Sequence, residues 1–344
     1  MRPTERYTWQ SRHPRGLSER QTIRNIVLQG DTWGYILASV QVDSIGKECM
    51  EEGHSYLYKG RLPVGFLGMV DDIVGITEAG FKAQKMNAFI NLKTAEKCLQ
   101  FGVTKCKSMI VGKNVNNVIN SDLMVDKWSV EYKDNLKTGE ADLVEQHCGL
   151  TEIGNAQVQK YLGFVLSSTG DNMANINAVK KKSIGVVKSA LNKLNSLNLK
   201  YYYFECSVII LNTMVRSSIL YASEMYYDLK EREVRQLERI EEGFLRKVLN
   251  TTKGCPIVQL YLTIGIFPAR FEIMKIKLLY LKNILQEKEN SLIRKIFFLQ
   301  IEMPTKGDWA SGCLKDLKYL EIYQSLEEIE CMSYNIFKTL LKQK

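Results

Sequence analysis

The fold is decided by one short stretch, residues 62–77, which reads LPVGFLGMVDDIVGIT. Two apolar runs rich in β-forming residues flank two adjacent acids, Asp71 and Asp72. This pattern predicts a tight β-hairpin with the aspartates at its tip. Because an isolated hairpin is marginally stable in water, we expect it to pack within a larger sheet.

The adjacent carboxylates of Asp71 and Asp72 repel each other, and water, protonation or a bound cation must relieve that repulsion. Hard oxygen ligands on a rigid turn suit Mg²⁺, which often shares its coordination sphere with substrate phosphates. The alternative interpretation is that Asp-Asp is ordinary turn chemistry. On the dipeptide alone, both interpretations stay open.

Helical periodicity surrounds the hairpin. Apolar residues recur at three- and four-residue spacing over residues 33–49 and 78–101, which predicts two amphipathic helices. Residues 52–60 read as a loop, and the first 24 residues read as an arginine-rich arm or a truncated start. Short strands are expected at residues 109–111, 128–132 and 160–166.

After Gly170 the chain becomes helical and basic. A helix is expected to begin near Asp171 or Asn172, and residues 171–200 hold six lysines against one acid. Further helical patterns follow at residues 203–227, 230–249 and 267–300, and one or two short helices from Trp309. The predicted class is therefore α+β, with an all-α second half that begins near residue 170.

Composition excludes several classes of protein. The chain has 344 residues with 45% hydrophobic and 25% charged residues, which is typical of a globular protein. No secretory signal is expected in the first 25 residues. The most apolar stretch, residues 201–227, is interrupted by charges, so no membrane span is expected. We therefore predict an intracellular protein of the nucleus or cytoplasm.

The eight cysteines and three histidines are scattered, and no two cysteines form a C-x-x-C pair. A zinc site needs ligands at short spacing, so none is expected. The cysteines are interpreted as reduced core thiols.

Four short motifs in residues 25–170 resemble the palm of a reverse transcriptase of the non-LTR (LINE-type) retrotransposon class. Met69-Val-Asp-Asp72 is similar to motif C of that family, and Leu28-Gln-Gly-Asp31 is similar to motif B. Thr104–Lys107 resembles the lysine-bearing motif D, and Lys160–Gly163 resembles the turn of motif E. The resemblance depends on their order and on the 41-residue separation of Gly30 and Asp71.

This resemblance implies a role for each matched residue. Asp71 and Asp72 would be catalytic carboxylates that bind Mg²⁺. Gln29, Gly30 and Asp31 would contact the nucleotide and the template, and Lys105 or Lys107 would protonate the leaving pyrophosphate. Tyr161, Leu162 and Gly163 would grip the primer. On a thumb-like helix, the nucleic-acid backbone would be contacted by Lys180, Lys181, Lys182 and Lys188.

Each of these residues also has a plain structural interpretation. Gly30 and Gln29 could be turn and loop residues, and the two motif D lysines could be a solvated strand flank. Tyr161 and Leu162 could face the core, and residues 180–182 could be an ordinary solvated helix face.

The resemblance also implies a third carboxylate from motif A, upstream of motif B. Asp31 is the first aspartate of the chain, and the acids before it, Glu5 and Glu19, lie among arginines. Met69 replaces the usual aromatic residue of motif C, and Thr32-Trp33-Gly34 replaces the usual Pro-Leu-Ser. The expectation is an incomplete palm without motif A or fingers, which does not polymerise alone.

The resulting prediction is a fragment derived from a reverse transcriptase, whose ancestral activity is RNA-directed DNA polymerisation with Mg²⁺ and deoxynucleotides. Its expected partners are an RNA template, a DNA primer or RNA–DNA hybrid, and a second chain that supplies motif A. The alternative is a non-catalytic nucleic-acid-binding protein that uses the basic thumb helix; the net charge of +9 is compatible with both. The predicted regions are an arm (1–24), a partial palm (25–170), a thumb-like region (171–300) and a short helical extension (301–344).

Overall fold

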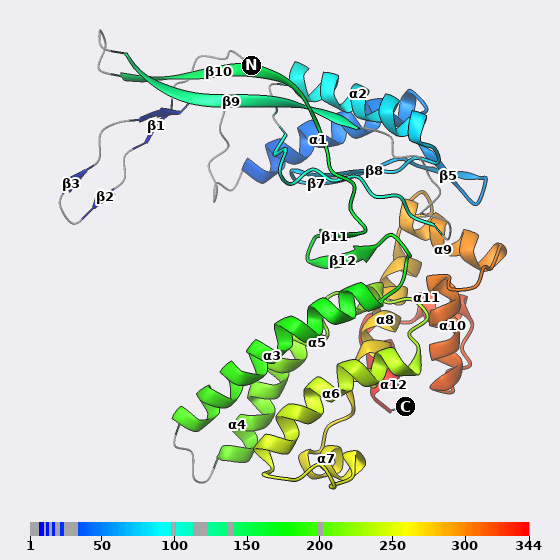
Figure 1. The fold of residues 1–344 in the computed structure, drawn as a ribbon. Coiled ribbons are helices and arrows are strands. Elements are labelled where there is room, and N and C mark those ends of the chain that lie inside the picture. The colour runs from blue at the N-terminus through cyan, green and yellow to red at the C-terminus, as the bar shows by residue number, and fades with distance from the viewer. Residues whose placement is uncertain are drawn as a thin grey trace. The chain divides into compact units, whose positions relative to one another are not determined.

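The computed structural model describes residues 7–9, 12–13, 16–17, 21–23, 34–97, 99, 101–112, 123–135, 140–197 and 202–343. They belong to two compact units (Figure 1). The first comprises residues 1–110 and 116–156, and the second comprises residues 111–115 and 157–344. The predicted α+β class is confirmed in its general form, since helices and small antiparallel sheets make up the described chain. The division lies after Ala156 instead of near residue 170.

The first unit is built on two helices, α1 (Gly34–Glu51) and α2 (Gly80–Glu96). Between them lie two antiparallel hairpins, β5–β6 and β7–β8. The apolar faces of the helices form a small core with Ile45, Cys49, Met86 and Ile90, against which Phe66 of β7 packs. The hairpin strands are β5 (Tyr56–Tyr58), β6 (Leu62–Val64), β7 (Phe66–Met69) and β8 (Asp72–Gly75).

A long hairpin, β9 (Met124–Asn135) and β10 (Glu140–Glu152), completes the first unit. Its pairing is antiparallel, with a register shift between His147 and Leu150. The side-chain amides of Asn87 and Asn91 on α2 both donate to the carbonyl of Met124, which joins this hairpin to α2. Parts of the predicted arm also pair: β1 (Tyr7–Trp9) with β4 (Gln21–Ile23), and β2 (Arg12–His13) with β3 (Gly16–Leu17).

Several local predictions for the first unit were wrong. Part of the predicted loop 52–60 is strand β5, and α2 ends at Glu96, five residues early. Residues 109–111 form no strand; Ser108 makes only a single bridge with Asn155. Every sheet of the described residues is a two-stranded pair, so the β7–β8 hairpin has no larger sheet among them. Its apolar side is covered by helices instead, because Phe66 packs on the core of α1 and α2.

The second unit begins with a hairpin and continues as a helical bundle. The predicted single strand at residues 160–166 is in fact β11 (Val158–Tyr161) and β12 (Phe164–Ser167), joined by a two-residue turn. Helix α3 (Met173–Ser196) follows at the predicted place. The predicted helix 203–227 is divided into α4 (Tyr203–Ile210), a π-helix (Leu211–Arg216), α5 (Ser217–Ile219) and a 3₁₀ turn (Ser223–Met225). Then come α6 (Glu231–Val248), α7 (Ile257–Ile264) and α8 (Ala269–Gln286).

Two hydrophobic cores stabilise the second unit. The first is shared by α3 to α7 and the start of α8, with Leu211, Leu237 and Phe244 fully buried. The second surrounds the rest of α8 and contains Phe297 and Phe337. It is closed by α9 (Leu292–Glu302), α10 (Trp309–Tyr319), α11 (Leu326–Cys331) and α12 (Tyr334–Gln343). The described residues from 309 to 343, within the predicted extension, thus contribute to this second core.

Six cysteines are free thiols, and two of these, Cys49 and Cys313, are buried. Burial raises the pKa of the Cys49 thiol to about 11, so this thiol stays protonated at neutral pH. The reduced-core interpretation holds for these two, whereas Cys331 is exposed. Among the described helices, none alone is long and apolar enough to span a membrane; α7 and α8 satisfy that test only as a pair bent by 66°.

Candidate functional site

The predicted acidic hairpin tip is present in the first unit. Strands β7 and β8 pair antiparallel up to Met69 and Asp72, so Val70 and Asp71 form a two-residue turn. Asp71 and Asp72 are both exposed. Neither carboxylate forms a hydrogen bond or an ion pair with another described residue. The two carboxylates are therefore accessible to solvent and to a ligand.

Backbone strain marks this turn. Val70 has φ = 60°, and Asp71 beside it has no positive φ. A positive φ at the first turn position alone is the pattern of a type II′ turn, where glycine is the favoured residue. A β-branched residue is poorly suited to this region, and such conformations cost about 1–3 kcal/mol. The rest of the hairpin must hold this turn in place.

Close helix–strand packing supplies that support. Gly46 of α1 lies against the ring of Phe66, where a β-carbon would collide with it. Gly68 of β7 would likewise bring a β-carbon to 2.8 Å from Val42 of α1. Because these two glycines let the strand approach the helix backbone, the hairpin is tied to α1 along its length. The acidic tip consequently projects from a fixed base.

The other predicted residues of the first unit are not gathered at this tip. Lys105 and Lys107 are exposed in an irregular segment, and neither forms an ion pair with Asp71 or Asp72. The Nζ atom of Lys107 instead lies against Gly154. Gln29, Gly30 and Asp31 lie outside the described residues. No group of three metal-ligating side chains exists in the described part of the chain.

A second candidate surface lies on the helical unit, at the turn of β11–β12. Leu162 and Gly163 both have positive φ, at 46° and 84°, the pattern of a type I′ turn. The Tyr221 hydroxyl donates a 2.7 Å hydrogen bond to the Leu162 carbonyl. A β-carbon on Gly163 would lie 2.6 Å from the Tyr221 hydroxyl, so glycine is needed for this contact. The turn resembling motif E is thus attached to the helical bundle.

Helix α3 is fixed beneath the same hairpin. The Asn175 side chain accepts a 3.0 Å hydrogen bond from the Val165 N–H of β12 and donates one of 2.9 Å to the Tyr226 hydroxyl. One face of α3 packs into the core through residues such as Ile176 and Leu194. The opposite side is therefore left to solvent.

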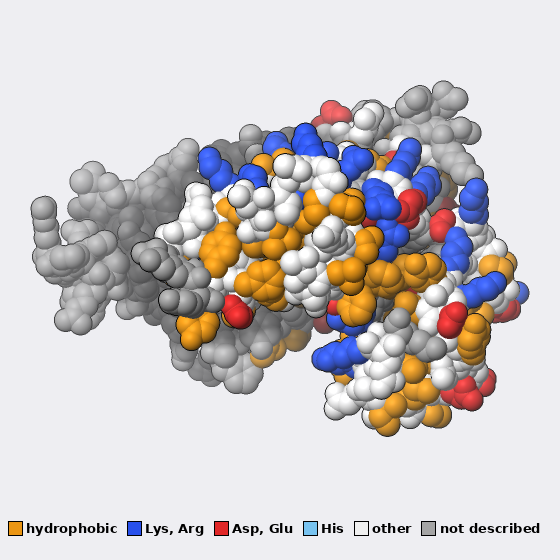
Figure 2. All heavy atoms as spheres, turned by 90° about the horizontal axis from the view of Figure 1, so that it is seen from below, with side chains coloured by type: hydrophobic (Ala, Val, Ile, Leu, Met, Phe, Trp, Pro, Cys, Tyr) orange, Lys and Arg blue, Asp and Glu red, His pale blue; other side chains and the backbone are white. Residues whose placement is uncertain are grey.

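The predicted lysines occupy that solvent side. Lys180, Lys181, Lys182 and Lys188 are exposed, and within the described residues none of them forms an ion pair. The Lys182 ammonium group lies 5.9 Å from the centre of the Tyr221 ring, a cation–π contact. Tyr221 therefore brings the hairpin turn and the lysine side of α3 together. Figure 2 shows Lys and Arg side chains along one margin of the visible face, with hydrophobic side chains exposed beside them.

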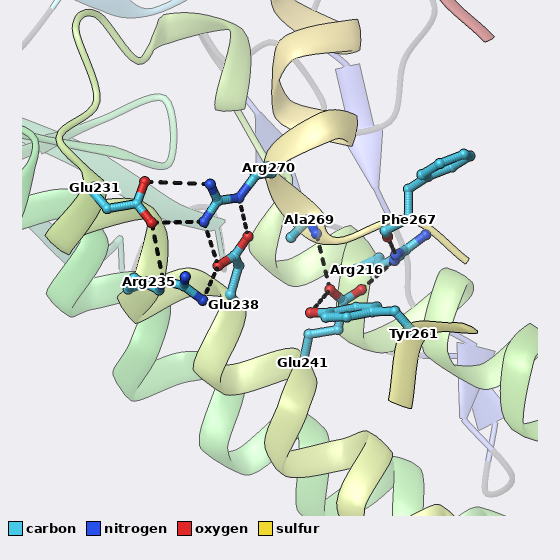
Figure 3. Close-up of polar contacts among 9 residues, drawn as sticks. All are labelled: Arg216, Glu231, Arg235, Glu238, Glu241, Tyr261, Phe267, Ala269 and Arg270. Carbon is cyan, nitrogen blue, oxygen red and sulfur yellow. Dashed lines mark hydrogen bonds and ion pairs between the residues drawn. The ribbon is translucent and has the colours of Figure 1, made fainter. Parts of the chain in front are cut away.

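A buried ionic network holds the bundle that carries this surface (Figure 3). Arg216, at the end of the π-helix, donates to Glu241 of α6 and to the Phe267 carbonyl. Glu241 also accepts from the Tyr261 hydroxyl at 2.8 Å and from the Ala269 N–H at 3.1 Å. One carboxylate thus connects four segments. Burial raises the pKa of Glu241, while Arg216 and the other donors oppose that rise.

A second, more exposed ionic network joins α6 to α8. Arg270 of α8 donates to Glu238 at 2.6 Å and to Glu231 at 2.9 Å, both on α6 (Figure 3). The Arg270 guanidinium lowers the pKa of Glu231, whose side chain is 64% exposed. Sequence reasoning identified neither network, because their members lie up to 51 residues apart.

Comparison with known proteins adds no relative: no family model, curated protein or solved structure matches the chain.

Proposed function

We propose that the chain derives from a reverse transcriptase, that its β7–β8 tip binds a divalent cation, and that its helical unit binds nucleic acid. One observation carries the proposal: two exposed, unpaired carboxylates stand on a strained turn that is fixed to a helix. Ordinary turn chemistry accounts for the aspartates but not for valine at a glycine-favouring position. Strained backbone concentrates at functional sites, which favours the metal interpretation.

The carboxylates of Asp71 and Asp72 are suited to form half of the ligand shell of a two-metal site. Asp71 and Asp72 would hold the ion, since Mg²⁺ is commonly bound by one or two carboxylates together with water and phosphate oxygens. When bound, such an ion neutralises charge on a transferring phosphoryl group. Asp71 and Asp72 would place that charge at the tip of a rigid hairpin, open to a nucleotide or a primer end.

Because the tip offers only the carboxylates of Asp71 and Asp72, we predict that the chain does not polymerise alone. With no third metal-ligating side chain grouped among the described residues, two carboxylates cannot hold both ions in the reactive geometry. We expect no primer extension by the purified chain on an RNA template with deoxynucleotides and Mg²⁺. Gel analysis of a labelled primer measures this, with Asp71→Asn as the control for contaminating polymerase. Extension by the natural chain that Asp71→Asn abolishes would contradict the prediction.

A non-catalytic nucleic-acid-binding protein is the second candidate. It is favoured by the unpaired lysines of α3 beside a hairpin turn that Tyr221 attaches to the bundle. Exposed lysines that lack acidic partners can pair with phosphates and release counterions. This function would not depend on Asp71, so under it Asp71→Asn should bind an RNA–DNA hybrid in Mg²⁺ as tightly as the natural chain does. Weaker hybrid binding by Asp71→Asn that appears only in Mg²⁺ favours the first candidate.

A further inference from the structure

A depression of about 280 Å³ opens on the helical unit where α3, α4 and α6 meet. Its volume is close to the roughly 300 Å³ of the smallest ligand pockets. It is lined by Lys188, Leu191, Asn192, Asn195, Tyr203 and Lys247.

Helix geometry explains how α3 contributes four of these six residues. Lys188, Leu191, Asn192 and Asn195 are spaced i, i+3, i+4 and i+7, so they lie along one face of the helix. Lys181 is seven residues before Lys188 and lies on that same face. The depression is thus at the end of a lysine row that continues towards the β11–β12 hairpin.

The lining combines charges, amides and one aromatic ring. Lys188 and Lys247 are exposed, none of the described residues that line the depression is acidic, and neither lysine forms an ion pair with a described residue. The Asn192 and Asn195 amides have no side-chain hydrogen bond within the described part of the chain. Tyr203 supplies an aromatic surface that is half-buried against the core. The two lysine ammonium groups can bind an anion. The asparagine amides can form hydrogen bonds with the polar edge of a ring, and the tyrosine ring can stack on a planar ring.

Two glycines leave the adjoining surface open. Gly185 of α3 and Gly243 of α6 precede Lys188 and Lys247 by about one helical turn, and a β-carbon on either would meet no atom within 4 Å. Glycine within a helix costs about 0.5–1 kcal/mol relative to alanine, and it permits close approach of a ligand. The two lysines are therefore not screened by bulky neighbours on that side.

We propose that this depression binds one nucleoside monophosphate unit, with its phosphate on Lys188 and Lys247 and its base against Tyr203. The unit is either a free nucleotide or an unpaired nucleotide of a strand that follows the α3 lysines; in the second case the inference rests on the proposed nucleic-acid binding. Stacking on an aromatic side chain tolerates any base, so no base preference is expected.

The test measures two probes on the full chain: AMP by calorimetry, and fluorescein-labelled dT12 by anisotropy. Tyr203→Leu keeps an apolar side chain but removes the ring, and should weaken binding about tenfold. Lys188→Ala/Lys247→Ala should weaken it at least as much. Lys193→Ala/Lys253→Ala removes the same charge from exposed positions that do not line the depression, and should have much less effect.

The two possible occupants, a free nucleotide and an unpaired nucleotide of a strand, give different results. Loss of AMP affinity in the depression variants indicates a free nucleotide, and loss confined to dT12 indicates an unpaired nucleotide of a strand. Equal effects of the depression variants and the control pair on both probes would overturn the proposal. So would failure of both 5-iodouridine monophosphate and a 5-iodouracil oligonucleotide to photo-crosslink to Tyr203 of the unsubstituted chain, a readout that does not depend on variant folding.

A parallel titration with an RNA–DNA hybrid separates this inference from the proposed function. If the hybrid binds while the depression variants leave dT12 and AMP unchanged, only the nucleotide site is wrong. If hybrid, dT12 and AMP all fail to bind, both proposals are wrong.

Discussion

Glu241→Gln is expected to destabilise the helical unit by about 3–5 kcal/mol, the usual cost of removing one partner of a buried ion pair. The side chains of Arg216 and Glu241 are 8% and 0% exposed, so water cannot replace the lost charge. Glutamine keeps the shape of glutamate but leaves the Arg216 guanidinium buried without a counter-charge. The measurement is urea denaturation followed by circular dichroism.

Glu231→Gln is the matched control for that experiment. It makes the same substitution on the same helix, at a carboxylate that also binds an arginine but is 64% exposed. An exposed pair contributes roughly 0–1 kcal/mol, so only a small loss is expected. Arg216→Met/Glu241→Gln should recover part of the stability, because it removes both charges together while glutamine still offers an acceptor to the Tyr261 hydroxyl and the Ala269 N–H. Equal losses for Glu241→Gln and Glu231→Gln would contradict this account of the network.

Neutralising Lys180, Lys181 and Lys182 together should reduce binding of an RNA–DNA hybrid by about tenfold to a hundredfold at low salt. Each lysine–phosphate contact contributes roughly 0.9 to the slope of log affinity against log salt on a duplex. The triple alanine variant should therefore have a slope shallower by about 2 to 3. Anisotropy titrations at several salt concentrations measure both quantities.

The control is Lys193→Ala/Lys253→Ala/Lys306→Ala, which removes the same charge from other exposed positions of the helical unit. Its slope should remain close to that of the natural chain, because none of these lysines belongs to the 180–182 run, and Lys193 lies about three helical turns further along α3 than Lys182. If both triple variants changed the slope equally, the binding would depend on net charge alone, and the α3 surface would have no specific role.

Local sequence patterns predicted the structure correctly where residues close together in the sequence determine it. The two apolar runs on either side of Asp71 and Asp72 correctly predicted a hairpin there, β7–β8, although its turn is Val70-Asp71 and Asp72 is paired with Met69. The apolar period after Asn172 correctly predicted α3 with its exposed lysines. In both cases the pairing or the helix face follows from residues within a few positions of one another.

Contacts between distant segments could not be predicted. Tyr221 binds the Leu162 carbonyl from 59 residues away, and no local period indicates that role. The π-helix that ends at Arg216 divides the predicted helix 203–227, and the buried partner of Arg216, Glu241, lies 25 residues further along the chain. Strand β10 was missed because clear alternation was found only in β9, the strand with which it pairs.

The fold locates part of the predicted catalytic set, and the roles of these residues stay predictions. The structure brings Asp71 and Asp72 to one tip and the motif E turn to the lysine helix. It does not bring Lys105 or Lys107 into an ion pair with the acids. Residues 29–31 lie outside the described chain, so their proposed contact with nucleotide and template stays a prediction.

Paramagnetic broadening of backbone amide resonances by Mn²⁺ tests the central claim, cation binding at the β7–β8 tip, most directly. We expect the first resonances to broaden at low Mn²⁺ to be those of residues 69–73, and excess Mg²⁺ to reverse the effect. Asp71→Asn/Asp72→Asn should abolish it, whereas Glu51→Gln/Glu52→Gln, a second pair of adjacent exposed acids, should not. Broadening spread evenly over exposed acids, or unchanged in Asp71→Asn/Asp72→Asn, would contradict the claim.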